Sequence, residues 1–131
     1  MKTFKNFLTE HRQSLAGPDG DLIKHEGGHI DIHTNSPYSP RKQSIIDFYV
    51  PEEKRGKGIG KELVRQALEK HKDLGGQASS KESIGILHKF GFRHPSMPTG
   101  SVEDHIKKYK EDSSVYMALN DEHGKKYVGE K

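Results

Sequence analysis

Residues 50–70, VPEEKRGKGIGKELVRQALEK, connect a predicted strand to a predicted helix through a glycine-rich loop. The preceding segment, 44–50, reads SIIDFYV, and its β-branched and aromatic residues favour a strand. In residues 59–68 apolar side chains recur at helical spacing, which predicts an amphipathic helix. They are Ile59, Leu63, Val64, Ala67 and Leu68. This order of elements brings the loop to the start of a helix.

The loop itself is RGKGIG, residues 55–60. Glycine lets the backbone approach a ligand closely, and the first-turn amides of a helix are donors without intrahelical partners. With the helix dipole behind them, these amides favour a phosphate or pyrophosphate. The loop fits neither a Walker motif, because Glu62 stands where Ser or Thr is required, nor a dinucleotide fingerprint, because Lys61 replaces its third glycine. A glycine-rich turn without a ligand is the plainer alternative.

Two segments together resemble the GNAT superfamily of N-acyltransferases. Residues 55–60 match its acyl-CoA-binding pattern, Arg/Gln-x-x-Gly-x-Gly, after a strand that ends in Val50. Residues 80–92, SKESIGILHKFGF, are similar to the family's second motif, a helix that closes with x-Lys-x-Gly-Phe before a strand. The resemblance implies an α+β fold (α/β three-layer), with a mixed central sheet flanked by helices. It also implies an N-acetyltransferase that moves an acetyl or other acyl group to a primary amine directly, in a ternary complex.

The resemblance implies acetyl-CoA as the cosubstrate. The loop amides would hold its pyrophosphate, and the end of the preceding strand would pair with its pantetheine arm. A backbone amide near Tyr49 or Val50 would polarise the thioester carbonyl. The expected cofactor-binding residues are Tyr49, Val50, Arg55, Gly56, Lys57, Gly58, Ile59, Gly60, Lys61 and Ser80. Leu87 stands where the family often has a Tyr that protonates the departing thiolate, so the acid is water, another residue or absent.

The amine acceptor, a small molecule or a protein amine, must lose a proton before it attacks. An amine like that of lysine has a pKa near 10.4, so about one molecule in several thousand is neutral at pH 7 and a base helps. Asp47 and Tyr49 share one face of the predicted strand and are the candidate catalytic residues, followed by His33. Ile46 and Phe48 are expected on the other face. A polar edge group and a half-buried ring are the plainer alternatives for the two candidates.

With 131 residues, the chain is expected to form one domain. A hydrophobic content of 30% and a mean hydropathy of −0.94 indicate a small core and a charged surface. The absence of cysteine excludes disulfides, thiolate metal sites and a cysteine nucleophile. No apolar run approaches the roughly 20 residues of a membrane helix, and a net charge of +3 with mixed signs does not imply nucleic acid. We expect no membrane partner, no metal, and a monomer or homodimer in the cytoplasm.

Three segments are expected: residues 1–16, a GNAT-like domain over 17–120 and a polar tail over 121–131. In the first, Phe4, Phe7, Leu8, His11 and Leu15 share one face, which predicts a helix packed on the sheet. Its start, MKTFKNFLTE, also resembles the short leaders of T-even-type phage internal head proteins, which are cut after a Leu/Ile-x-Glu tripeptide. That resemblance implies a phage-encoded protein in the host cytoplasm or the virion interior. It favours the alternative function, a catalytically weak or inactive GNAT-fold binding or virion-associated protein.

A hairpin is predicted before the central strand, with arms at 21–25 and 29–34. Its second arm carries the pattern His29-x-Asp31-x-His33, which is either a set of metal ligands or the polar side of a sheet. Residues 35–43 follow as a loop. In it Tyr38 and Arg41 either touch the substrate or belong to the surface.

The second half of the chain is expected to begin with a glycine cap at 73–76, which ends the central helix. A short strand at 77–79 is required by the resemblance, although its composition is poor for a strand. The helix of the second motif follows, capped by Ser80 or Ser79. A further helix over 101–109 and a strand over 114–120 complete the domain.

Overall fold

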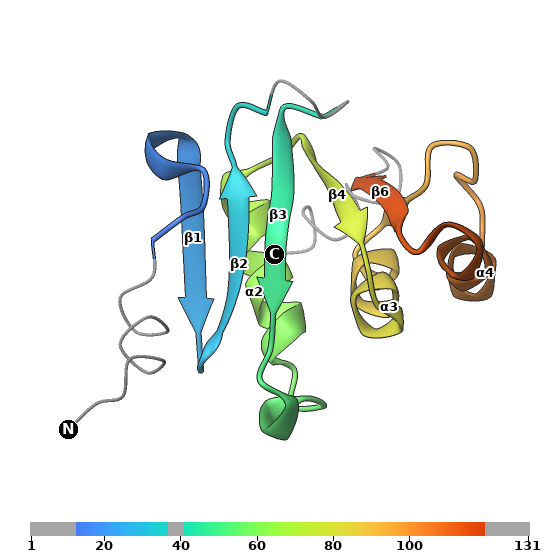
Figure 1. Ribbon diagram of the computed structural model, residues 1–131, viewed down its shortest axis with the longest axis horizontal. Helices are drawn as coiled ribbons and strands as arrows, with labels where there is room; N and C mark the ends of the chain where they lie inside the picture. The colour runs from blue at the N-terminus through green and yellow to red at the C-terminus, as the bar shows by residue number, and fades with distance from the viewer. Residues whose placement is uncertain (1–12, 37–40, 120–131) are drawn as a thin grey trace.

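The computed structural model describes residues 13–36 and 41–119, which form one mixed sheet with helices packed against it (Figure 1). The strands are β1 (Gly20–His25), β2 (Gly28–His33), β3 (Gln43–Tyr49), β4 (Leu74–Ala78), β5 (Phe92–Arg93) and β6 (Val115–Leu119). Within these ranges they lie in the order β1-β2-β3-β4-β6-β5. The neighbours β3 and β4 are parallel, and the other described pairs are antiparallel. The expected α+β fold with a mixed central sheet is confirmed.

The described helices are α2 (Ile59–Lys70), α3 (Lys81–Lys89) and α4 (Val102–Asp112). Two short 3-10 turns, η1 (Gly17–Asp19) and η2 (Glu52–Lys54), precede β1 and α2. α2 packs against β1 and β2, while α3 packs against β4, α2 and α4. In Figure 1 both α2 and α3 lie behind the sheet, so the opposite face of β1–β3 is turned toward the viewer.

The apolar face predicted for α2 forms the centre of the core. Its buried side chains are Ile59, Leu63, Val64, Ala67 and Leu68. Burying a side chain of the size of leucine contributes about 1.5–3 kcal/mol. Gly28 brings the start of β2 close to both β3 and α2, because a Cβ at this position would lie 2.9 Å from the backbone oxygen of Tyr49 and 3.2 Å from Ile59. The helix of the first motif is thereby fixed over the sheet.

A β-bulge interrupts the pairing of β2 with β3. Asp31 lies opposite Asp47, but the next pair is Ile32 with Ile45, so Ile46 is an extra residue in β3. Strict alternation placed Ile46 with the half-buried Phe48, and that prediction is wrong. The extra residue reverses the alternation, so Ile45 enters the core and the side chain of Ile46 is 39% exposed.

The two glycines predicted to cap α2 belong instead to β4. α2 ends at Lys70, where the N–H of His71 still bonds to the carbonyl of Ala67. Gly75 and Gly76 lie in β4, and glycine is required at both positions because the neighbouring atoms leave no room for a side chain. A Cβ would meet the hydroxyl of Tyr116 at 2.5 Å over Gly75 and the Cβ of Ile45 at 2.9 Å over Gly76.

The chain before β1 is tied to the sheet by polar bonds. Asp31 is fully buried, and its carboxylate accepts from Ser14 Oγ at 2.6 Å and from the N–H of Leu15 at 2.8 Å. Leu15 was expected on a packed helical face, but residues 13–16 contain a turn and the side chain of Leu15 is 70% exposed. The rest of that expected helix, Tyr38 and the expected tail over 121–131 lie outside the described residues.

The remaining predicted elements are present. The hydroxyl of Ser80 accepts the N–H of Ser83 at 3.1 Å and so starts α3. α4 starts with a reciprocal capping box between Ser101 and Asp104, and it continues three residues beyond the predicted end at 109. β6 occupies the predicted strand over 114–120.

Candidate functional site

The glycine loop reaches the N-terminus of α2 through two left-handed residues. Gly56 has φ +83° and Gly58, the N-cap residue, has φ +81°, which glycine adopts without steric cost. No side chain caps the helix at Gly58, so its first-turn amides remain available to a ligand. Gly60 keeps the loop close to α3, because a Cβ there would lie 2.7 Å from Cδ1 of Ile86. The local geometry is that of an anion site at a helix N-terminus.

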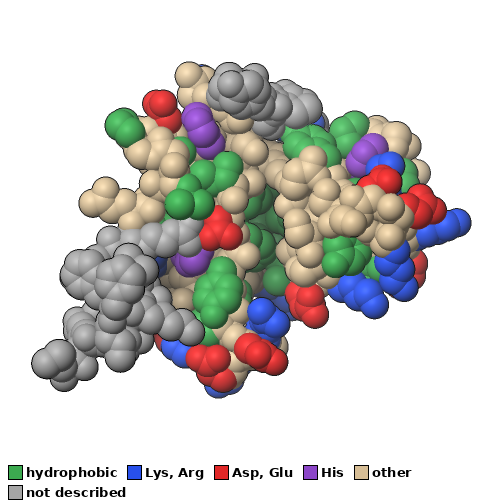
Figure 2. Space-filling view, viewed as in Figure 1, with side chains coloured by type: hydrophobic (Ala, Val, Ile, Leu, Met, Phe, Trp, Pro, Cys, Tyr) green, Lys and Arg blue, Asp and Glu red, His purple; other side chains and the backbone are tan. Residues whose placement is uncertain are grey.

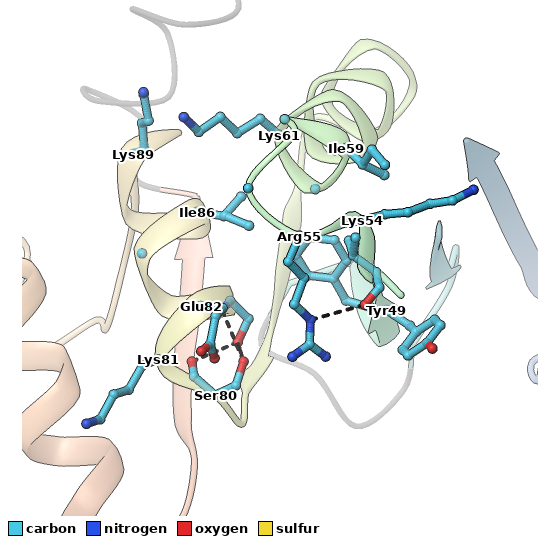
Figure 3. A pocket seen from close by; sticks show the side chains of 17 residues that line it. Tyr49, Lys54, Arg55, Ile59, Lys61, Ser80, Lys81, Glu82, Ile86 and Lys89 are labelled. Atoms are coloured by element: carbon cyan, nitrogen blue, oxygen red, sulfur yellow. Dashed lines mark hydrogen bonds between the residues drawn. The ribbon is translucent and has the colours of Figure 1, made fainter. Parts of the chain in front are cut away.

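A cavity of about 620 Å³ lies between this loop and α3 (Figure 3). The expected cofactor-binding residues that line it are Tyr49, Val50, Arg55, Gly56, Gly58, Ile59, Gly60, Lys61 and Ser80. Lys57 is not among its lining residues. The two sequence motifs, which are separated by β4 along the chain, therefore form opposite walls of one cavity.

Two cationic side chains at this cavity hold the loop itself. Arg55 donates from Nε to the carbonyl of Val50 at 3.2 Å, as the dashed line in Figure 3 shows. Lys54 donates from Nζ to the carbonyl of Glu26 at 3.0 Å and so ties η2 to the β1–β2 turn. These two bonds hold in place the segment that connects β3 to α2.

A second cavity of about 680 Å³ lies between β3 and β4. The parallel pairing of these strands ends at Ile45 and Gly76, directly before the bulged Ile46. The strands separate beyond that point, and Figure 2 shows the resulting hollow, with hydrophobic side chains at its base. Residues that border both cavities are Phe48, Arg55, Ser80 and Ser83. The two cavities therefore adjoin, and a ligand anchored at α2 can extend between the strands.

Asp47 and Tyr49, the two candidate catalytic residues, lie together with His29. Oδ2 of Asp47 accepts from Nε2 of His29 at 2.8 Å, and the rings of His29 and Tyr49 have centroids 5.7 Å apart. Asp47 lines the second cavity and Tyr49 the first. His29 was considered only as a possible metal ligand, because its place opposite Tyr49 follows from the pairing of β2 with β3. His33 lies elsewhere, with Nδ1 accepting the N–H of Asn35 at 3.2 Å.

Leu87 leaves the second cavity without the tyrosine that the resemblance implied there. Its side chain is 2% exposed and lines this cavity. His88 lines neither cavity, and its Nε2 bonds to the carbonyl of Gly100 at 2.8 Å. Tyr116 of β6 also lines the second cavity, and sequence reasoning did not identify it. Its hydroxyl lies over Gly75, where β4 has no side chain.

The pattern His29-x-Asp31-x-His33 does not assemble a metal site. Asp31 is engaged by Ser14 and Leu15, and His29 is bonded to Asp47. In the ranges 13–36 and 41–119 no group of three His, Asp or Glu side chains is placed to hold a metal ion. Across these same ranges no helix has the length and apolar character to cross a membrane.

Arg41 has a structural role at the far end of β3. It donates to Oδ1 of Asp73 at 3.1 Å, and it lines neither cavity. The backbone N–H of Lys42 and then Arg41 hold the pKa of Asp73 below its ordinary value. The alternative that Arg41 touches the substrate is therefore not supported by its position.

The chain was compared with known proteins. A family model described as Acetyltransferase (GNAT) family matches residues 19–92, which is more than half of the chain. The matched range runs from the end of η1 to the start of β5 and includes both walls of the first cavity. Neither the curated proteins nor the solved structures include a match.

Proposed function

Because the chain belongs to the acetyltransferase (GNAT) family, we propose that it transfers an acetyl group from acetyl-CoA to a primary amine. Acyltransferase activity in general follows from the family. The donor is inferred from the site, and the primary amine from the resemblance to N-acyltransferases. One observation carries the inference. An anion site at a helix N-terminus opens directly into a cleft between two separating strands.

The two cavities suit the two chemically different parts of a CoA thioester. The first-turn amides of α2 would bind the pyrophosphate, as oriented donors backed by the helix dipole. The pantetheine arm would extend between β3 and β4. Beyond Ile45 the edge of β3 that faces β4 has no strand partner among the described residues, so its amide and carbonyl groups are suited to the amides of this arm. A β3 amide near Tyr49 or Val50 would polarise the thioester carbonyl.

Asp47 would act on the acceptor. An alkylammonium must lose one proton before nitrogen attacks the thioester and a second one afterwards. The carboxylate of Asp47 accepts the first, directly or through water, and the second passes to solvent. The bond from His29 fixes the orientation of the Asp47 carboxylate. The attack forms the C–N bond of the amide and breaks the C–S bond of the thioester. Direct transfer is consistent with the absence of cysteine.

The departing thiolate needs a proton, and Tyr116 is the candidate that we propose. Leu87 has no group that can donate a proton. Tyr116 lines the same cavity from β6, its hydroxyl lies over Gly75, and it would regain its proton from solvent after transfer to sulfur.

A second candidate function is favoured by Leu87 itself. A protein that binds the CoA carrier without efficient turnover needs the loop but not an acid in the cleft. Turnover with a panel of amines separates the two functions, because the binding protein would retain affinity for acetyl-CoA and release no thiol.

Calorimetry and thermal shift with CoA, acetyl-CoA and ATP test the proposed donor. We expect CoA and acetyl-CoA to bind and raise Tm, and ATP to do neither at the same concentration. The variant Gly58→Glu should lose this binding, because it places a carboxylate at the pyrophosphate site. Gly17→Glu is the matched control, since Gly17 has φ +61°, no atom within 4 Å of an added Cβ, and a position in η1 away from both cavities. Folded protein without heat from CoA at millimolar concentration would contradict the proposal.

A further inference from the structure

Cationic side chains add positive charge to the first cavity, beyond the positive end of the α2 dipole. Among the described residues that line it, the cationic side chains are Lys54, Arg55, Lys61, Lys81 and Lys89, and the acidic one is Glu82. Lys54 and Arg55 are bonded to backbone carbonyls of the loop and the β1–β2 turn. Lys61, Lys81 and Lys89 make no such bond to the loop or the turn within the described part of the chain. Their presence at the cavity therefore needs a different explanation.

Lys61 and Lys89 form a pair of like charges. Lys61 extends from the first turn of α2 and Lys89 from the last turn of α3, and Figure 3 shows the side chain of Lys61 reaching toward Lys89 at the edge of the cavity. A close polar contact with Lys89, then charge repulsion and then desolvation lower the pKa of Lys61. No carboxylate of the described part of the chain pairs with either lysine, and Glu82 lies at the opposite end of α3.

This placement is unfavourable in the protein without a ligand. The N-terminus of α2 carries the positive end of the helix dipole, which favours acidic rather than basic side chains in the first turn. Like charges held side by side repel, and local arrangements that oppose stability concentrate at binding sites. An anion at this edge of the cavity would remove the repulsion between Lys61 and Lys89.

We propose that Lys61 and Lys89 form a second anion subsite, which binds a phosphate monoester of the carrier next to the pyrophosphate at the α2 amides. This inference rests on the proposed function, because it takes the pyrophosphate site as its neighbour. CoA has such a monoester on its ribose, whereas dephospho-CoA has only the pyrophosphate. The subsite therefore makes the protein select CoA over dephospho-CoA.

Calorimetry with CoA and dephospho-CoA tests the subsite in the full chain. We expect the wild type to bind CoA about tenfold more tightly, which is the contribution of one charge-assisted hydrogen bond at an exposed site. Lys89→Gln should remove most of this preference and leave the affinity for dephospho-CoA unchanged, and Lys61→Gln should also reduce the preference. Lys81→Gln is the control, because Lys81 lines the same cavity from the other end of α3 and should leave the preference intact.

Two results would overturn the subsite: equal affinities of the wild type for both carriers, or a Lys89→Gln variant that weakens both carriers alike. If neither carrier binds, adenosine 3′,5′-bisphosphate and ADP are compared in the same way. A preference for the bisphosphate that Lys89→Gln abolishes would support the subsite and overturn only the proposed CoA function. No preference would overturn both. High salt should reduce the preference, because the subsite is exposed.

Discussion

Ile45 and Gly76 form the last parallel pair between β3 and β4, and a Cβ on Gly76 would lie 2.9 Å from the Cβ of Ile45 and 3.1 Å from its backbone oxygen. The strands are therefore in close contact at their last pair, with no room for a side chain on Gly76. The bulge at Ile46 follows immediately, where the pairing of β3 with β4 has ended. A glycine at this position keeps the strands paired below the cleft while the cleft opens above it.

Gly76→Ala is expected to destabilise the fold. The added methyl group meets backbone and Cβ atoms, which cannot rotate away as the end of a flexible side chain can, so the sheet must shift. We expect the free energy of unfolding to fall by about 1–3 kcal/mol, as for other overpacked cores. Urea unfolding followed by circular dichroism measures it.

Gly85→Ala provides the comparison for that variant. Gly85 lies within α3, and no atom lies within 4 Å of an added Cβ. Alanine should raise the free energy of unfolding by about 0.5–1 kcal/mol through helix propensity. Equal effects of the two substitutions would show that the contact of Gly76 with Ile45 does not limit the approach of the strands.

The contribution of Glu62 to the free energy of unfolding should be lost as the pH becomes acidic. Glu62 receives hydrogen bonds from Arg65, one helical turn later, and these lower its pKa from 4.5 to about 2. A folded-state pKa below the unfolded one gives stability that is fully present above pH 4.5 and is lost as the pH falls toward 2. Because the pair is partly exposed, we expect Glu62→Gln to cost only about 0.5 kcal/mol at neutral pH and low salt.

Urea unfolding of the wild type and Glu62→Gln, from pH 7 to pH 3, measures this difference. It should shrink below pH 4.5, and about 1 M salt should reduce it at neutral pH. A difference that persists unchanged at pH 3 would mean that packing, rather than charge, is lost in the variant.

The sequence predicted the parts of this molecule that depend on local order. The start of α2 and its buried face follow from the spacing of Ile59 to Leu68, and the loop at 55–60 was recognised from its glycines. The bulge at Ile46 was missed, because an extra residue is defined only by the pairing of two strands. The glycines at 75 and 76 were misread as a helix cap, since their role depends on Ile45 and Tyr116, which are distant in the chain.

For the site, too, the sequence predicted the residues that are neighbours in the chain and not those that the fold brings together. The residues expected at the loop, apart from Lys57, meet in one cavity because they are close together in the chain, and Ser80 was supplied by the second motif. The pairing of His29 with Asp47 and the contact of Lys89 with Lys61 were not predicted, because the members of each pair are on different elements. Only the fold brings such pairs together.

Tyr116→Phe tests the proposed acid. The variant keeps the ring over Gly75 and removes the hydroxyl, so we expect the kcat of amine acetylation to fall about 10²-fold while the affinity for acetyl-CoA is unchanged. Tyr109→Phe is the control, since Tyr109 is half-buried in α4 against the core and lines neither cavity. An unchanged kcat in Tyr116→Phe would assign the proton to water.

Asp47→Asn tests the proposed base. The amide cannot take a proton from the acceptor, so we expect kcat/KM to fall about 10²–10⁴-fold, with acetyl-CoA bound as in the wild type. The deficit should narrow as the pH approaches about 10.4, where the amine is neutral without help. Asp21→Asn is the matched control, because Asp21 accepts from Nε2 of His71 at 2.8 Å, the same distance as between Asp47 and His29. This substitution removes the charge from an equivalent bond away from both cavities and should leave kcat/KM intact. Equal losses of activity in the two variants would assign Asp47 a structural role, as would a deficit that does not change with pH.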